Sequence, residues 1–208
     1  DQTASLSPGW TRKATRIEEP DDGPPVMDRV VVVLCRAEGA MNVGATCRAA
    51  MTMGVRRLSL VACPDYDDDI VRMHALAAWP LYLGARRCAS LDEALADVSI
   101  VAGFTRRTGE RRKRSIDVRA FADMATTRFY GTGAERQQIA LVFGNERNGL
   151  SDEELASCNL AVHIDTDRSF PSLNLSHAVQ LACWELRNAG SEALKARNAT
   201  GSGTMTVN

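Results

Sequence analysis

The sequence contains no pair of cysteines or histidines at the spacing of a metal site or a disulfide framework. Its six cysteines are spread widely along the chain, no Cys-x-x-Cys pair occurs, and three of them sit inside apolar runs. Cysteines of this kind are typical of reduced, small core residues in a cytoplasmic protein. We therefore expect no zinc, no disulfides and no other metal.

Long hydrophobic runs are also missing. No stretch approaches the length of a membrane span, and the N-terminus lacks the apolar core of a signal peptide. We expect no membrane partner and a cytoplasmic location. The formal net charge of −1 does not by itself indicate a nucleic-acid partner.

Two signatures of nucleotide-binding proteins are absent as well. No G-x-G-x-x-G follows the first apolar run, and no Walker motif G-x-x-x-x-G-K-[ST] occurs anywhere. These absences argue against a nucleotide-binding oxidoreductase, a class that alternating strands and helices would otherwise allow.

The chain contains one foldable unit between two irregular ends. Residues 1–27 carry four prolines and no sustained periodicity, which predicts an extended, partly disordered arm, and residues 199–208 read as a flexible tail. Residues 28–198 are long enough for one domain with a sizeable core.

Strand-like and helix-like segments alternate within this unit. The apolar patterns predict strands at 30–34, 57–63, 99–104, 139–144 and 160–165, and helices at 43–53, 69–78, 91–97, 117–125, 151–157 and 174–197. Near-continuous apolar strands separated by helices predict an α/β fold with a mainly parallel sheet covered on both faces.

Three short motifs carry the chemical information. The first is N-x-G-x-x-x-R, which begins at Asn42 and ends at Arg48 in a small-residue helix closed by Gly54. The second, F-G-x-E-x-x-G-L-S, covers 143–151 and includes Glu146. The third, S-L-N-L-S-x-A-V, covers 172–179 and crowds small and hydrogen-bonding residues at the start of an apolar helix.

These motifs, in this order and spacing, resemble the SpoU (TrmH) family of SPOUT RNA ribose 2′-O-methyltransferases, and most closely its TrmJ-like branch, which acts on tRNA. The resemblance covers about residues 29–188. It implies a SPOUT fold with a C-terminal trefoil knot, S-adenosylmethionine as the cofactor, tRNA as the RNA partner with methylation in the anticodon loop, and a homodimer.

The resemblance also implies which residues do the chemistry. The catalytic candidates are Arg48, Asn42, Glu146 and Asn174. Arg48 would assist the attacking ribose hydroxyl, although a guanidinium cannot serve as a literal base because it has no lone pair to accept a proton. For Asn42, a plain helix N-cap is an equally good interpretation of the sequence alone.

A second group of residues matches the cradle of the methyl donor. Its members are Phe104, Thr105, Arg106, Gly144, Ile164, Pro171, Ser172 and Leu173. At 103–107 the chain reads G-F-T-R-R, which departs from the usual T-S-A-R-like pattern of the family.

A run of basic residues directly follows the Phe104–Arg106 segment. We expect it to contact RNA phosphates without reading sequence, although a solvated loop would have the same composition. Its members are Arg107, Arg111, Arg112, Lys113 and Arg114.

Two alternatives to a tRNA methyltransferase stay open at this point. The same chemistry could act on rRNA, or the chain could be a SPOUT-like module that binds RNA without catalysis. The presence of Asn42, Arg48, Glu146 and Asn174 argues against the non-catalytic alternative.

Overall fold

The computed structural model describes residues 23–106, 115–131 and 137–201, which build a seven-stranded sheet in which neighbouring strands run parallel. Along the sheet the order is β3-β2-β1-β6-β4-β7-β5. In chain order the strands are β1 (Val30–Cys35), β2 (Leu58–Val61), β3 (Arg86–Cys88), β4 (Ile100–Phe104), β5 (Ile116–Asp117), β6 (Ile139–Phe143) and β7 (Leu160–His163).

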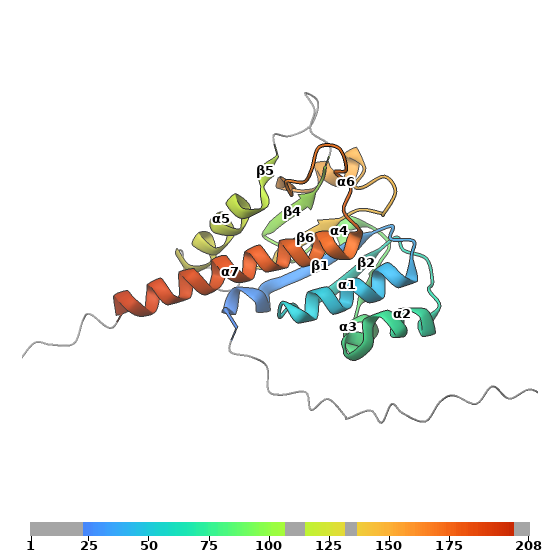
Figure 1. Cartoon of the computed structure of the whole chain (residues 1–208), viewed down its shortest axis with the longest axis horizontal. Coiled ribbons are helices and arrows are strands. Elements are labelled where there is room, and N and C mark those ends of the chain that lie inside the picture. Colours follow the sequence, from blue (N-terminus) through green and yellow to red (C-terminus); the bar gives the residue numbers. More distant parts are fainter. Residues whose placement is uncertain (1–22, 107–114, 132–136, 202–208) are drawn as a thin grey trace, which may run out of the picture.

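Helices cover both faces of this sheet. One face carries η1 (Pro25–Arg29), α1 (Ala40–Thr52), α2 (Asp68–Ala75), η2 (Leu76–Ala78), α3 (Trp79–Leu83), α5 (Val118–Gly131) and α7 (Leu175–Gly201). The other face carries α4 (Leu91–Leu95) and α6 (Asp152–Ala156). Helix α7 crosses the front of the sheet between α5 and α1, and its C-terminal end runs out beyond the sheet (Figure 1).

The alternation of side chains along β1 explains why the fold has two apolar layers. Val32 and Leu34 point into the layer beneath α1 and α7, while Val33 and Cys35 point into the layer beneath α4 and α6. All six β1 residues are buried, as expected for a central strand of a covered parallel sheet. The predicted α/β fold with a parallel sheet is therefore confirmed, while the trefoil knot stays a prediction.

The five predicted strands all form, but the sheet has two more. β3 and β5 are only three and two residues long, and they occupy the two edges of the sheet. Such short segments carry no periodic pattern that a sequence window could detect. Predicted helix 117–125 also proves longer, since α5 continues to Gly131.

The predicted helix over 69–78 was wrong at its end, because α2 stops at Ala75. Leu76 adopts a positive φ of 53°, which breaks the helical hydrogen-bond ladder, and a new short helix, α3, starts at Trp79 with Pro80 in its first turn. The predicted glycine end of α1 is confirmed, because Gly54 lies at φ 89° directly after the C-cap residue Met53.

The folded domain starts slightly earlier in the chain than residue 28, the boundary that the composition predicted. Val26 and Met27 of η1 are buried in the core under α7, so these two residues belong to the domain. The six thiols are free, and all but Cys63 are buried. Among the described residues, no helix is long and apolar enough to cross a membrane.

Candidate functional site

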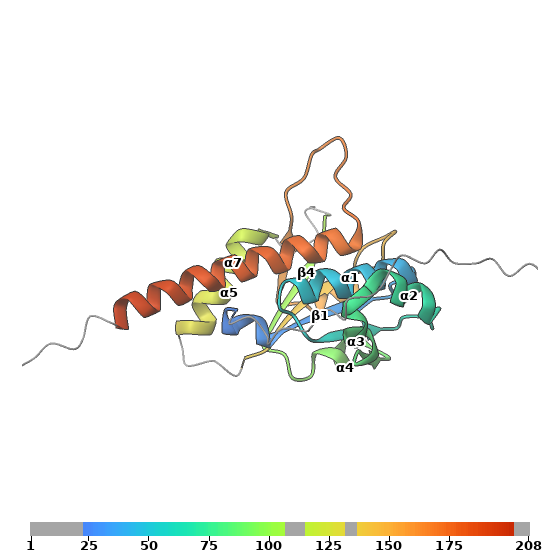
Figure 2. The ribbon, with the colours of Figure 1, turned by 60° about the horizontal axis from the view of Figure 1, so that its bottom comes forward.

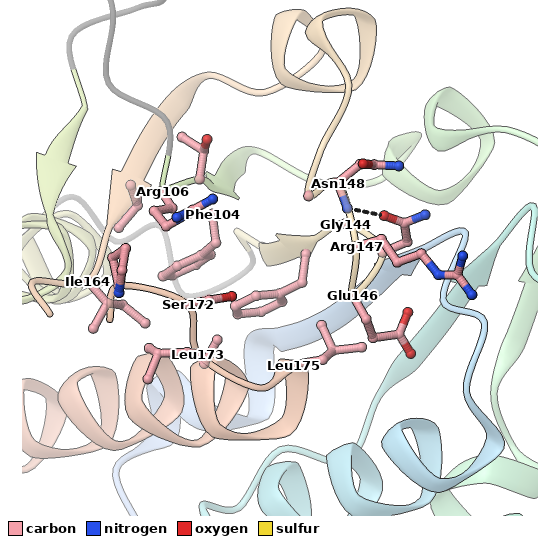
Figure 3. Close-up of a pocket in the computed structure, with 17 residues that line it drawn as sticks. Phe104, Arg106, Gly144, Glu146, Arg147, Asn148, Ile164, Ser172, Leu173 and Leu175 are labelled. Atoms are coloured by element: carbon pink, nitrogen blue, oxygen red, sulfur yellow. Dashed lines mark hydrogen bonds between the residues drawn. The ribbon is translucent and has the colours of Figure 1, made fainter. Parts of the chain in front are cut away.

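A pocket of about 860 Å³, measured out to its open mouth, lies at the edge of the sheet where β4, β6 and β7 end. Parallel strands present their carboxyl ends at one edge, and open α/β sheets bind ligands in the crevice outside those ends. Figure 3 shows three chain segments around it: the end of β4, the loop after β6, and the loop from β7 into α7. That last loop stands out from the body of the molecule (Figure 2).

The structure brings all eight residues predicted for the methyl donor to this one pocket. The lining contains Phe104, Thr105, Arg106, Gly144, Ile164, Pro171, Ser172 and Leu173. They come from segments up to 69 positions apart in sequence, since the lining runs from the end of β4 to the start of α7. Glu146 of the second motif lines the pocket as well.

Aromatic and aliphatic side chains form the inner wall of the pocket. The rings of Phe104 and Phe143 stack with 4.4 Å between their centroids and an interplanar angle of 15°. Val162 and Ile164 complete this wall from β7 and the residue after it. An apolar wall with a few polar groups at its mouth suits a flat, weakly polar ring system.

The loop after β6 makes a tight turn that only glycine permits at its first position. A side chain on Gly144 would collide with the backbone of Gly149 and Leu150. The turn is closed by the Gly149 N–H, which donates to the Asn145 carbonyl over 3.1 Å, and Gly149 itself lies at φ 69°. The Asn148 N–H donates to the Asn145 side chain over 2.8 Å (Figure 3). The backbone of this loop is thereby exposed to the pocket.

The three motifs meet in one chain of hydrogen bonds. The Asn42 side chain donates to the Glu146 carboxylate over 2.9 Å, and the Asn174 side chain donates to the Asn42 amide oxygen over 2.9 Å. Asn174 in turn accepts hydrogen bonds from the backbone and the hydroxyl of Ser176 in the first turn of α7. Each amide has one fixed orientation in this chain, because each uses its donor on one side and its acceptor on the other.

Glu146 stays ionised in this arrangement. Burial alone would raise the pKa of its carboxyl, but hydrogen bonds from Asn42 and from the backbone N–H groups of Glu38 and Gly39 outweigh burial and lower the pKa below its usual value. The carboxylate is therefore an acceptor that organises the start of α1. The N-cap of α1 is Gly39, and the alternative interpretation of Asn42 as a plain N-cap is wrong.

Arg48 lies apart from this group. It is exposed on α1, six residues beyond Asn42, or about 9 Å farther along the helix axis, and it does not line the pocket. Six residues along a helix place two side chains on different faces, so Arg48 lies away from Asn42, and its catalytic role stays a prediction. Arg107, Arg111, Arg112, Lys113 and Arg114 lie outside the described residues.

Several lining residues were missed by the sequence analysis. They are Phe143, Asn145, Arg147, Asn148, Gly149, Val162, Leu175 and Ala178. Phe143 and Val162 lie at or next to the last residue of a strand, and the others fall within the second and third motifs. The position of a residue at a strand's carboxyl end is the signal that could have identified the first two.

Comparison with known proteins gives a consistent match. The model of the SpoU rRNA methylase family matches residues 29–184. A tRNA (cytidine/uridine/adenosine-2′-O-)-methyltransferase TrmJ from Pseudomonas aeruginosa is 35% identical over 164 residues, which cover 79% of this chain and 62% of that relative. The chain thus spans somewhat less than two thirds of the length of that relative.

Solved structures agree with the fold. The crystal structure of a probable methyltransferase from Bordetella pertussis Tohama I superposes with a TM-score of 0.73 at 32% identity, covering 79% of this chain and 97% of that one. The SpoU methyltransferase AviRb from Streptomyces viridochromogenes, in complex with the cofactor AdoMet, gives a TM-score of 0.60 at 25% identity over 81% of this chain and 62% of that one.

Proposed function

The chain belongs to the SpoU rRNA methylase family, and from that premise we propose that it transfers a methyl group from S-adenosylmethionine to a ribose 2′-hydroxyl of RNA, with tRNA as the first candidate substrate. One observation carries the proposal. Residues from all three motifs converge at one edge of the sheet, where Glu146 both lines the pocket and accepts the hydrogen bond that begins the Asn42–Asn174 chain. The Pseudomonas aeruginosa relative, a tRNA 2′-O-methyltransferase, points to tRNA.

The residues of the pocket fit S-adenosylmethionine. Gly144, where a side chain could not be placed, lets the loop backbone approach a ligand, and the wall of Phe104, Phe143 and Ile164 suits adenine. The bound cofactor would supply an activated methyl group on a sulfonium. Phe104, Thr105, Arg106, Ile164, Pro171, Ser172 and Leu173 would hold the cofactor together with Gly144.

The task of the chain's own residues is alignment and help with the loss of the hydroxyl proton. Arg48 would bind the phosphate next to the target ribose and stabilise the negative charge that develops on the 2′-oxygen. The proton would leave to that phosphate or to water, because a guanidinium has a pKa above ~12 and cannot accept it. Asn42 and Asn174, held by Glu146, would position the ribose.

A homodimer would bring Arg48 to the reaction. Arg48 lies outside the pocket of its own chain, so the arginine of a second copy is the one that would reach the substrate. Helix α7 offers a surface for such a contact, since Leu181 and Trp184 lie on one side of it with 38% and 48% of their surfaces exposed. Large apolar side chains exposed together on one helix are typical of an interface.

The basic run would contact RNA phosphates. In the sequence it directly follows Arg106, which lines the pocket, and this adjacency along the chain supports a role of the run in binding the substrate. Charge reversal at Arg111 and Arg112 should weaken RNA binding and flatten its dependence on salt while leaving cofactor binding intact.

The decisive experiment is methyl transfer from labelled S-adenosylmethionine to total tRNA and, separately, to rRNA. We expect label in tRNA at a ribose 2′-oxygen, and we expect Arg48→Ala to abolish it while Arg48→Lys keeps the charge but loses most of the activity. Label in rRNA alone would show that the substrate is rRNA and not tRNA, while the proposed methyl transfer would stand. Full activity in Arg48→Ala would refute the role of the arginine. Cofactor binding without transfer to either RNA would point to another RNA substrate or a missing partner, and the lack of cofactor binding would favour an RNA-binding module.

A further inference from the structure

Arg36 is a charged residue that none of the three motifs contains, and the structure gives it an unusual position. It directly follows β1, and its backbone lies at φ 52°, in the left-handed region that residues with a side chain rarely adopt. The backbone N–H of Arg36 donates to the Val61 carbonyl at the end of β2 over 2.8 Å. A backbone held in this region against its own preference is a marker of a functional constraint.

The side chain of Arg36 reaches across the sheet edge to two partners in the region after β6. It makes a two-pronged ion pair with Glu154, with its Nε 2.8 Å from one carboxylate oxygen and its terminal nitrogen 2.7 Å from the other. The same terminal nitrogen donates to the Gly149 carbonyl over 3.1 Å. Gly149 lines the pocket, whereas Arg36 and Glu154 do not.

Glu154, the partner of Arg36, is also hydrogen-bonded to the end of the pocket loop. Its carboxylate accepts the Ser151 N–H over 2.7 Å, and the Ser151 hydroxyl accepts the Glu154 N–H over 3.1 Å. This reciprocal pair is the capping box that starts α6. One carboxylate therefore fixes both the arginine and the point at which the loop becomes a helix.

The first half of the loop, residues 145–147, is bound by residues that follow Arg36 closely in the chain. The Glu38 carboxylate accepts from the Asn145 side chain over 3.3 Å and pairs with Arg147 over 3.2 Å. As described above, the backbone of Glu38 and Gly39 donates to Glu146. Residues 36–39 thus contact the loop at its beginning, through 145–147, and at its end, through 149–154.

The Arg36–Glu154 and Arg147–Glu38 ion pairs differ in how exposed their side chains are to water. The Arg36 and Glu154 side chains are 36% and 15% exposed, whereas Arg147 and Glu38 are 79% and 51% exposed. An exposed ion pair contributes little, while a two-pronged arginine–carboxylate pair with a shielded partner imposes a defined geometry. Of these two ion pairs, the one between Arg36 and Glu154 is therefore the one that holds the loop in the more defined geometry.

We propose that Arg36 is a positioning residue, which acts through Glu154 and the Gly149 carbonyl to hold the loop 144–151 in the shape that admits the methyl donor. The inference rests on the proposed function to the extent that the ligand of this pocket is S-adenosylmethionine. Arg36 touches neither cofactor nor substrate; it sets the position of the backbone that does.

The test compares two ion pairs of the same chemical type. Arg36→Ala and Glu154→Gln remove the pair behind the pocket loop, whereas Arg119→Ala removes a pair of 3.5 Å with Glu185 that joins α5 to α7 away from the pocket. S-adenosylmethionine binding is measured by titration calorimetry at 15 °C, after circular dichroism has established that each variant is folded there.

We expect Arg36→Ala and Glu154→Gln each to weaken S-adenosylmethionine binding about tenfold, the effect of losing one charge-assisted hydrogen-bond pair, and Arg119→Ala to change it less than about twofold. In methyl transfer, the KM for S-adenosylmethionine should rise while the KM for RNA stays constant. Arg36→Lys keeps the charge without the two-pronged geometry, so its affinity for S-adenosylmethionine should lie between those of Arg36→Ala and the wild type. Equal affinity in the wild type and Arg36→Ala would overturn the proposal, as would an equal loss in Arg119→Ala.

A second measurement needs no ligand and therefore separates this inference from the proposed function. In Glu154→Gln, amide hydrogen exchange should become faster in residues 144–151 while the amides of β1 and α7 keep their protection. Unchanged exchange in the loop would overturn the positioning role of Arg36 even if the cofactor binds. If the wild type itself does not bind S-adenosylmethionine, the proposed function fails, and the exchange result still decides whether Arg36 holds the loop.

Discussion

Replacing Glu146 with glutamine tests whether its carboxylate organises the site. One carboxylate oxygen accepts the Gly39 N–H over 3.0 Å and the Asn42 amide over 2.9 Å, and the other accepts the Glu38 N–H over 3.1 Å. Glutamine has a single acceptor oxygen, so its NH2 group must face one of these donors. The best arrangement keeps two hydrogen bonds, both neutral, and leaves the Glu38 N–H opposite another donor.

The magnitude follows from these three contacts. Losing one hydrogen bond to a charged acceptor costs about 1.5 kcal/mol, and converting the other two from charged to neutral costs about 1 kcal/mol each. Because Glu146 is partly exposed, water recovers part of this loss, and we expect a net loss of about 2 kcal/mol in the free energy of unfolding. For a chain of this length, that corresponds to a fall in Tm of about 4–8 °C.

The assay is thermal unfolding followed by circular dichroism at pH 7, with Glu192→Gln on the exposed side of α7 as the matched control. The pH dependence provides an internal check. The pKa of Glu146 is lowered in the folded state, so its stabilisation is complete above the unfolded pKa of about 4.3 and is lost as the pH falls through the lower folded value. The Tm difference between the wild type and the variant should therefore shrink below about pH 4. A variant that melts within about 1 °C of the wild type at pH 7 would refute the reasoning.

Three further predictions concern other parts of the molecule. Gly44→Ala should lower stability by about 1–3 kcal/mol, because its new methyl group would collide with the backbone of α2, whereas Gly131→Ala, with open space around it, should not; denaturant unfolding of both compares them. At pH 8 Ellman's reagent should label at most Cys63 in the folded protein, since the other thiols are buried and burial raises the pKa of Cys47 to about 12; rapid labelling of more than one thiol would contradict this. Trp184→Glu should shift the protein to a monomer in size-exclusion chromatography with light scattering and should reduce methyl transfer; an active monomer would refute the dimer proposal.

Much of the fold could be predicted because the apolar patterns are strong. Four of the five predicted strands form fully buried strands and the fifth, β7, is buried at its centre; the structure places all of them in one parallel sheet. The two edge strands could not be predicted, because β3 contains two exposed arginines, Arg86 and Arg87, and owes its strand conformation to pairing with β2. Pairing with a neighbour that lies far away in sequence is a tertiary effect that local propensity does not encode.

In the candidate site too, the sequence motifs identified residues but did not give their complete arrangement in space. The motifs named Asn42, Glu146 and Asn174, and these three side chains are hydrogen-bonded to one another. The six-residue spacing of Asn42 and Arg48 already separates the two side chains on a helix, but the motif does not indicate which face of the helix meets the ligand. The partnership of Arg36 with Glu154 joins residues 118 positions apart, and nothing in the local sequence of either residue indicates the other.

The strand order has a consequence for how the protein is made. β1 and β4 are not neighbours, because β6 lies between them and pairs with both. On a growing chain, the segment up to β5 can therefore pair only β1, β2 and β3, while β4 and β5 lack their partners. β6 (residues 139–143) joins β4 to this group, and the sheet becomes continuous when β7 (residues 160–163) arrives. The pocket, whose lining extends to Ala178, is completed later still. Contacts of such high sequence separation fold slowly, so we expect ligand-binding competence to be among the last properties that a newly synthesised chain acquires.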